Sequence, residues 1–132
     1  MKCFQRLCDR CISVEESGTG WDKIAQNCEQ MFLPAPRIFN YPENTKVTMF
    51  VRVSFASITT EDRRWACYLH ACLSYVEGRQ INNSTLRRRF DLDEKSSATI
   101  SRMIKDCVEA GLIKPFDAET APRYMKYIPY WA

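Results

Sequence analysis

The chain has 132 residues, of which 45% are hydrophobic and 27% are charged, a balance typical of a soluble globular protein with a core. Its length predicts one domain, or one small domain with part of another. The longest uncharged run of the C-terminal half, residues 65 to 76, is too short to span a bilayer. Because no apolar segment follows the N-terminus, we predict a cytoplasmic protein without a secretory signal or a membrane partner.

The chain contains seven cysteines. Three of them fall on predicted helices, where we expect small buried hydrophobic side chains in a reducing cytoplasm: Cys67, Cys72 and Cys107. Three others lie near the N-terminus, the last two with the spacing of metal ligands: Cys3, Cys8 and Cys11. A zinc site needs a second ligand pair, and only Cys28 and the lone His70 remain for it. We therefore predict no metal and no cofactor, with a metal-sensing switch through the N-terminal cysteines as an alternative.

Residues 1 to 57 are interpreted as the tail of a preceding domain, built from helix and β-hairpin. Residues 1 to 16 carry apolar side chains at helical spacing and start without a cap. After a flexible turn, in which Thr19 or Gly20 is the expected cap, a helix is predicted over about residues 21 to 32. Pro34 and Pro36 end it, because the residue before each proline is driven out of the helical region.

A β-hairpin is predicted next, with a short strand over residues 37 to 41 and a longer one over residues 46 to 55. The longer strand places a row of alternate apolar residues on one face: Val47, Met49, Val51, Val53 and Phe55. Because a hairpin of this size is not stable alone, we expect it to pair with another element.

From residue 58 the pattern is helical. Thr59 and Thr60, followed by two acids, cap a first helix that Gly78 ends. A second, short helix is predicted over residues 85 to 90, capped by the preceding Asn-Asn-Ser sequence, with its arginines largely outward. A third is capped by Ser96 or Ser97 and runs to about residue 110.

Two strands, over residues 112 to 116 and 124 to 130, follow the third helix. Three helices followed by a hairpin is the layout of a winged helix-turn-helix. The predicted fold class is therefore α+β, with a winged helix-turn-helix domain over residues 58 to 132 and a helix and β-hairpin segment before it.

Positive charge is concentrated in residues 79 to 105, which carry seven basic and three acidic side chains, a net charge of +4. Residues 61 to 78 and 106 to 132 each have a net charge of −1. This distribution is typical of a localised anion-binding face, and a solvated helix surface is the alternative.

A helix-turn-helix places its second helix in the major groove with the N-terminal residues near base edges. Arg102 is then placed for a bidentate contact to guanine, and the arginines of the preceding helix for the phosphate backbone. Basic residues of the hairpin add phosphate or minor-groove contacts. The predicted site for double-stranded DNA comprises Arg87, Arg88, Arg89, Lys95, Ser96, Ser97, Thr99, Arg102, Lys105, Lys114, Arg123 and Lys126.

Other function classes are weaker from the sequence. Winged helices also serve as interaction modules, and Asp106 and Glu109 give the third helix mixed charge. In that alternative, residues 37 to 55 and the apolar stripe around Trp65 form a partner contact or a homodimer. We predict no catalytic residue, because the chain has no Walker loop and no paired histidines, and His70 is interpreted as structural.

Three segments carry a family resemblance: Gly-Thr-Gly-Trp-Asp-Lys at residues 18 to 23, the Leu-Pro-Ala-Pro break, and Ala-Gly-Leu-Ile-Lys-Pro at residues 110 to 115. With the hairpin and the closing residues, they resemble the C-terminal region of bacterial transcriptional regulators labelled ATP-dependent DNA helicase RecG-related. The parent proteins carry an AlbA-type (Schlafen-like) N-terminal domain. The resemblance covers the chain from about Ile12 onward and implies a cytoplasmic regulator with an appended winged helix. It implies no helicase activity here, since no motor motif is present.

Overall fold

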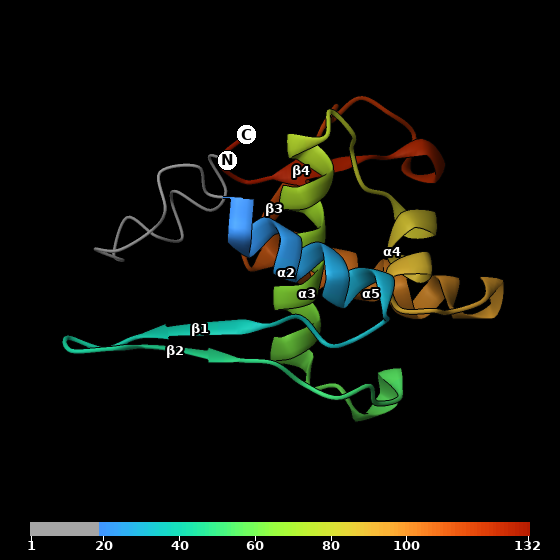
Figure 1. The fold of residues 1–132 in the computed structure, drawn as a ribbon. Coiled ribbons are helices and arrows are strands. Elements are labelled where there is room, and N and C mark those ends of the chain that lie inside the picture. Colours follow the sequence, from blue (N-terminus) through green and yellow to red (C-terminus); the bar gives the residue numbers. More distant parts are fainter. Residues whose placement is uncertain (1–18) are drawn as a thin grey trace.

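The computed structural model describes residues 19 to 132. The helix predicted over residues 1 to 16, together with Cys3, Cys8 and Cys11, lies outside the described residues. The described part is an α+β fold of helices and two small antiparallel hairpins, as the sequence predicts (Figure 1).

Helices and hairpins follow one another in a simple order along the chain. The α-helices are α2 (Thr19–Gln30), α3 (Thr60–Val76), α4 (Asn83–Arg89) and α5 (Ser97–Glu109). Strand β1 (Arg37–Asn40) pairs with β2 (Thr45–Thr48), and β3 (Ile113–Pro115) pairs with β4 (Tyr127–Pro129). Three 3-10 turns, η1 (Phe55–Ser57), η2 (Glu94–Ser96) and η3 (Pro122–Tyr124), precede α3, α5 and β4.

Helix α2 begins slightly earlier than predicted and buries Trp21, Ala25 and Cys28. These residues lie three and four apart and therefore share one face of the helix. Beyond the helix end, Phe32 adopts a φ of 55°, and Leu33 N donates to the Cys28 carbonyl at 2.8 Å. Glycine usually supplies this left-handed position. The ring of Phe32 lies beneath the Arg52 guanidinium, whose Cζ is 5.3 Å from the ring centre.

The first hairpin projects from the helices as an arm, residues 37 to 54 (Figure 1). Strand β2 is shorter than the predicted strand over residues 46 to 55, because residues 49 to 54 have no strand to pair with. The apolar row from Val47 to Val53 is consequently exposed, by 39% to 78%. Phe55, which follows these residues in the predicted strand, packs against the core. Its ring meets the Phe90 ring edge-on, with 5.1 Å between the ring centres.

The three later helices lie within two residues of their predicted bounds. Thr59 Oγ1 accepts from the backbone N–H of Asp62 at 3.1 Å and caps α3. Asn82 and Thr85 form a reciprocal capping box at the start of α4, which satisfies two backbone donors that the helix leaves free. Gly78 and Gly111 follow α3 and α5 with φ of 75° and 71°, values that favour glycine.

The second hairpin packs on α3 through β4. Ile81, between α3 and α4, exchanges two backbone hydrogen bonds with Tyr127, at 3.0 and 2.8 Å. Strand β4 is shorter than the predicted strand over residues 124 to 130, because η3 occupies the start of that segment. The bridge at Ile81 fixes the hairpin against the start of α4.

One contiguous hydrophobic cluster joins both halves of the described chain. Trp21 and Ala35 pack with buried side chains of α3, α4 and α5 and with Ile113 of β3. Trp65 Nε1 donates to the Pro36 carbonyl at 2.8 Å, and Arg37 Nε donates to Asp62 at 2.7 Å. The segment before residue 58 therefore shares its core with the helices that follow it.

The buried cysteines follow the sequence prediction in part. Cys67 and Cys107 are free thiols with no exposed surface, and Cys28 is free and buried as well. Cys72 is also buried, but it is not a free thiol, so the expectation of a reduced side chain fails at this position. In the described residues, no helix is long and apolar enough to cross a membrane, and no group of potential ligands is arranged to hold a metal ion.

Candidate nucleic-acid interface

Helices α4 and α5 are joined by the side chain of Asn83, in the first turn of α4. Its Nδ2 donates to the Ser97 carbonyl at 2.8 Å and to Ser101 Oγ at 2.9 Å. Its Oδ1 accepts from Arg87 Nε at 2.8 Å and from Ser97 Oγ at 3.3 Å. The amide thus uses both donors and both lone pairs, and it fixes the start of α5 beside α4.

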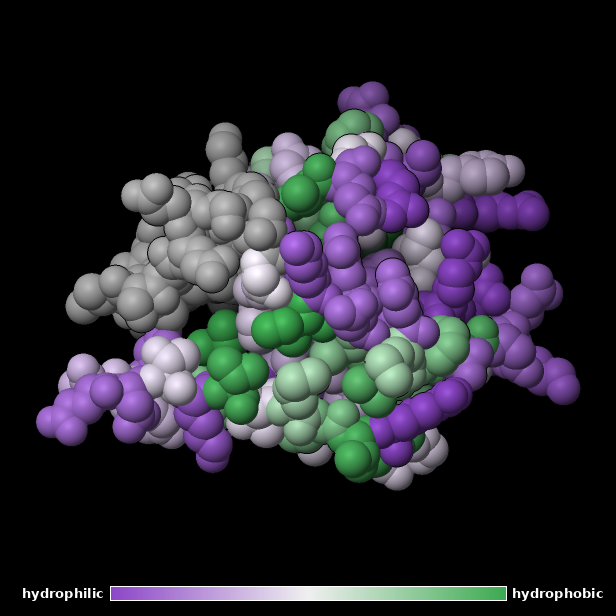
Figure 2. Space-filling model, viewed as in Figure 1, coloured by the Kyte–Doolittle hydropathy of each residue, from purple (hydrophilic) through white to green (hydrophobic). Residues whose placement is uncertain are grey.

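Exposed basic side chains border this pair of helices. They are Arg88, Lys95, Arg102 and Lys105. Lys105 lies 3.9 Å from Glu109, one helical turn later, while Arg88, Lys95 and Arg102 form no ion pair with any described residue. Figure 2 shows hydrophilic side chains along the side of the molecule where α4 and α5 lie. These cations are therefore available to an external anion.

The hydroxyl residues at the start of α5 differ in exposure and in the hydrogen bonds that their side chains already form. Ser97 and Thr99 are exposed, and Ser96 is half-buried at the N-cap position without a capping hydrogen bond from its side chain. Ser97 Oγ already donates to Asn83. Thr99 is the hydroxyl of this set that is both exposed and uncommitted within the described residues.

Arg87 and Arg89 depart from the prediction of three outward arginines. Arg87 is half-buried, and its Nε is committed to Asn83. Arg89 is buried, with 5% of its surface exposed, and it cannot reach an external phosphate. Its assignment to the DNA site is therefore wrong. The helical period explains the error, because position 89 lies on the same face as the buried Leu86 and Phe90.

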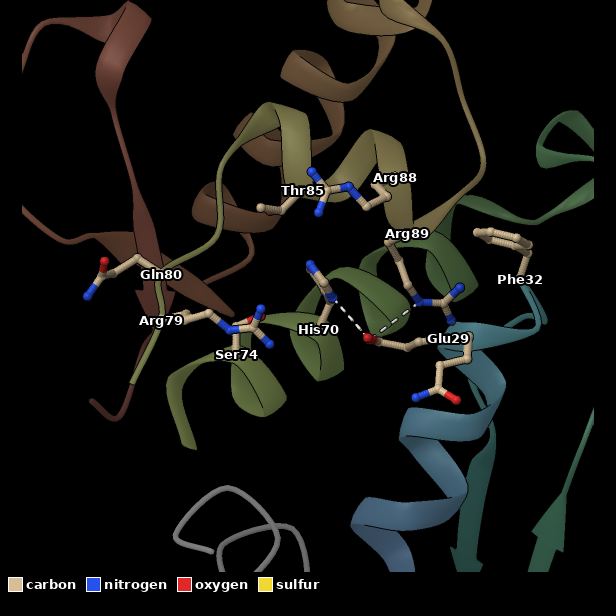
Figure 3. A pocket seen from close by; sticks show the side chains of 10 residues that line it. Glu29, Phe32, His70, Ser74, Arg79, Gln80, Thr85, Arg88 and Arg89 are labelled. Carbon is tan, nitrogen blue, oxygen red and sulfur yellow. Dashed lines mark hydrogen bonds and ion pairs between the residues drawn. The ribbon is translucent and has the colours of Figure 1, made fainter. Parts of the chain in front are cut away.

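Arg89 instead ties α4 to the end of α2. Its Nη2 donates to the Leu33 carbonyl at 2.9 Å, and its Nε lies 3.4 Å from Glu29 Oε1 (Figure 3). Burial lowers the pKa of Arg89 from its usual value, and the Glu29 carboxylate acts in the opposite direction. Glu29 also contacts His70 Nδ1, at 3.0 Å. Sequence reasoning missed Glu29, because nothing local marks a partner about 40 to 60 residues away.

The basic residues of the second hairpin are only partly open. Lys114 is half-buried, and its Nζ donates to the backbone carbonyl of Ala132. Arg123 and Lys126 are exposed, and the Arg123 guanidinium lies 5.8 Å from the centre of the Tyr124 ring. The hairpin therefore offers two cations to a ligand rather than the predicted three.

Comparison of the chain with protein-family models, with curated proteins and with solved structures found no match. The resemblance to RecG-related regulators thus remains an expectation from the sequence segments that carry it.

Proposed function

We propose that residues 58 to 132 form a winged helix-turn-helix that docks on double-stranded DNA and has no catalytic activity of its own. The order α3, α4, α5, β3 and β4 supports this architecture, as does the backbone bridge of Ile81 to Tyr127, which adds a third strand segment beside the hairpin. The Asn83 hydrogen bonds support it further, because they hold the start of α5 beside the start of α4.

The observation that carries the DNA proposal is the exposure of Arg88 and Arg102 without an acidic partner among the described residues. In this proposal α5 enters the major groove and Arg102 contacts a base edge. Arg88 and Lys95 contact phosphates, and Arg123 and Lys126 contact the flanking backbone. The protein would be a cytoplasmic bacterial transcriptional regulator, in agreement with the resemblance in its sequence.

Salt dependence of duplex binding tests the proposal. The logarithm of the association constant should fall linearly with the logarithm of salt concentration, because bound cations displace the counterions of DNA. Arg88→Glu combined with Arg102→Glu should weaken binding and reduce the slope by about 0.9 for each phosphate that the protein no longer neutralises. Lys23→Glu combined with Lys46→Glu, an equal charge change at exposed positions outside α4 and α5, is the control. Equal effects of both variants would refute a localised DNA face.

A second function, assembly of two copies, is favoured by the exposed apolar row of the arm, Val47 to Val53. Both strands of the β1–β2 hairpin also have an unpaired edge among the described residues, and such edges are templates for pairing with another chain. If this is the function, sedimentation shows a dimer that Val51→Lys dissociates and Arg88→Glu leaves intact. A monomer at micromolar concentration excludes it.

A further inference from the structure

A pocket lies between the end of α2, helix α3 and helix α4. Its volume is about 320 Å³, at the lower end of the range of small-molecule sites. Figure 3 looks into it: Arg88 and Thr85 of α4 border one side, Arg79 and Gln80 the side after α3, and the His70 ring stands between them. Phe32 supplies an aromatic ring at the opposite end. The pocket thus has a polar floor and an apolar end.

The charges that line this pocket favour an anion. Three arginines face one carboxylate, that of Glu29, and the carboxylate is already engaged by Arg89 and His70. The guanidinium of Arg79 is paired with Glu77, which does not line the pocket. Arg88 is left as an exposed cation with no ion pair among the described residues.

A buried polar atom of the pocket lining is without a partner. His70 Nε2 is shielded from solvent and forms no hydrogen bond, although buried polar groups nearly always do. The opposite nitrogen, Nδ1, lies 3.0 Å from the Glu29 carboxylate. Because an ionised carboxylate only accepts, Nδ1 carries the proton, and Nε2 offers a lone pair in the neutral ring or an N–H in the cation.

We propose that this pocket binds a small organic anion, a molecule with one phosphate or carboxylate group attached to an apolar body. The anionic group accepts from the Arg88 guanidinium and, after a small adjustment of the side chains that line the pocket, forms a hydrogen bond with His70 Nε2. The apolar body packs on Phe32. The ligand supplies the hydrogen-bond partner that Nε2 lacks and the counter-charge that Arg88 lacks.

Regulation of DNA docking follows from the position of Arg88, and this part rests on the proposed function. Arg88 belongs both to the pocket and to the exposed basic surface of α4. A ligand anion on Arg88 competes with a DNA phosphate for the same guanidinium. Because coupling between two binding sites is reciprocal, the ligand weakens DNA docking and DNA weakens ligand binding by the same factor.

The test uses phenyl phosphate and benzoate as probes, with benzyl alcohol as the uncharged comparison. His70 is the chain's one histidine, so its imidazole signals in nitrogen-15 NMR spectra are unambiguous. We expect a saturable shift of the Nε2 signal with at least one of the two anions, and no such shift with benzyl alcohol. The anion that binds identifies the head group. Absence of a saturable shift with both anions, or an equal response to benzyl alcohol, overturns the proposal.

Two matched arginine variants localise the binding. Arg88→Gln should weaken probe binding at least tenfold in calorimetric titration, while Arg102→Gln, on an exposed position of α5 outside the pocket, should leave it unchanged. Unchanged binding in Arg88→Gln refutes the site. Arg102→Gln should still lose DNA affinity, so a failure of the DNA proposal is seen separately from a failure of the ligand site. Saturating probe should raise the dissociation constant for duplex DNA several-fold, and no change would refute the regulatory coupling.

Discussion

Arg89 illustrates how a charged residue acts structurally when its surroundings bury it. Its guanidinium lies between the Glu29 carboxylate and the Leu33 carbonyl, and the next arginine along the chain, Arg88, is exposed. The two residues are neighbours in a run of three identical side chains. The two arginines differ only in their positions on the helix, and these positions give Arg89 a structural role and leave Arg88 as a surface cation.

This difference predicts opposite consequences of the same substitution. Arg89→Ala leaves Glu29 half-buried without its arginine and should lower the free energy of unfolding by about 3 kcal/mol. Arg88→Ala removes an exposed side chain and should change it by less than about 0.5 kcal/mol. Urea denaturation of both variants measures the contrast, and equal stabilities would contradict the buried ion pair.

Asn83 is the second residue with a predicted effect on structure. Asn83→Ala removes four hydrogen bonds within and between α4 and α5 and should destabilise the protein by about 1 to 3 kcal/mol. Hydrogen exchange should accelerate in the first turn of α5, since that turn loses its anchor. Ser84→Ala, at an exposed neighbouring position, is the control. Exchange rates that are the same in both variants would show that Asn83 does not hold the helices together.

At the scale of elements, the sequence predicts most helices and caps because their causes are local. Thr59 and Gly78 bracket α3 as predicted, and the amphipathic spacing of α5 places Ile100, Ile104 and Cys107 in the core. The capping position of α4 is Asn82 rather than a residue further along. These features depend on a few adjacent residues, and the local sequence pattern therefore predicts them.

The elements that the sequence predicts poorly depend on distant partners. Alternation of apolar residues indicated a strand up to residue 55, but a strand exists only where another strand pairs with it, and β2 ends at Thr48. The same limit applies to the candidate site. Exposure of Arg88 and Arg102 followed from helix faces, whereas the engagement of Arg89 by Glu29 and of Lys114 by the Ala132 carbonyl required the folded chain.

At the scale of the whole molecule, one hydrophobic cluster extends from Trp21 to Ile113. Removal of residues 1 to 57 would take away Trp21 and Ala35 from that cluster, and it would leave Arg89 without Glu29 and Leu33. We predict that a fragment of residues 58 to 132 is less stable than the full chain by more than about 3 kcal/mol. Circular dichroism during thermal unfolding measures the difference. A fragment as stable as the full chain would show that residues 58 to 132 form an independent domain.

The most direct test of the proposed DNA-docking surface is backbone amide chemical-shift mapping during titration with a short DNA duplex. We predict that the largest shifts cluster at residues 84 to 88, 95 to 102 and 123 to 126, and that they diminish as salt concentration rises. Shifts confined to the arm, residues 37 to 54, or no saturable shift at low salt, would contradict the assignment of α4 and α5 as the DNA-docking surface.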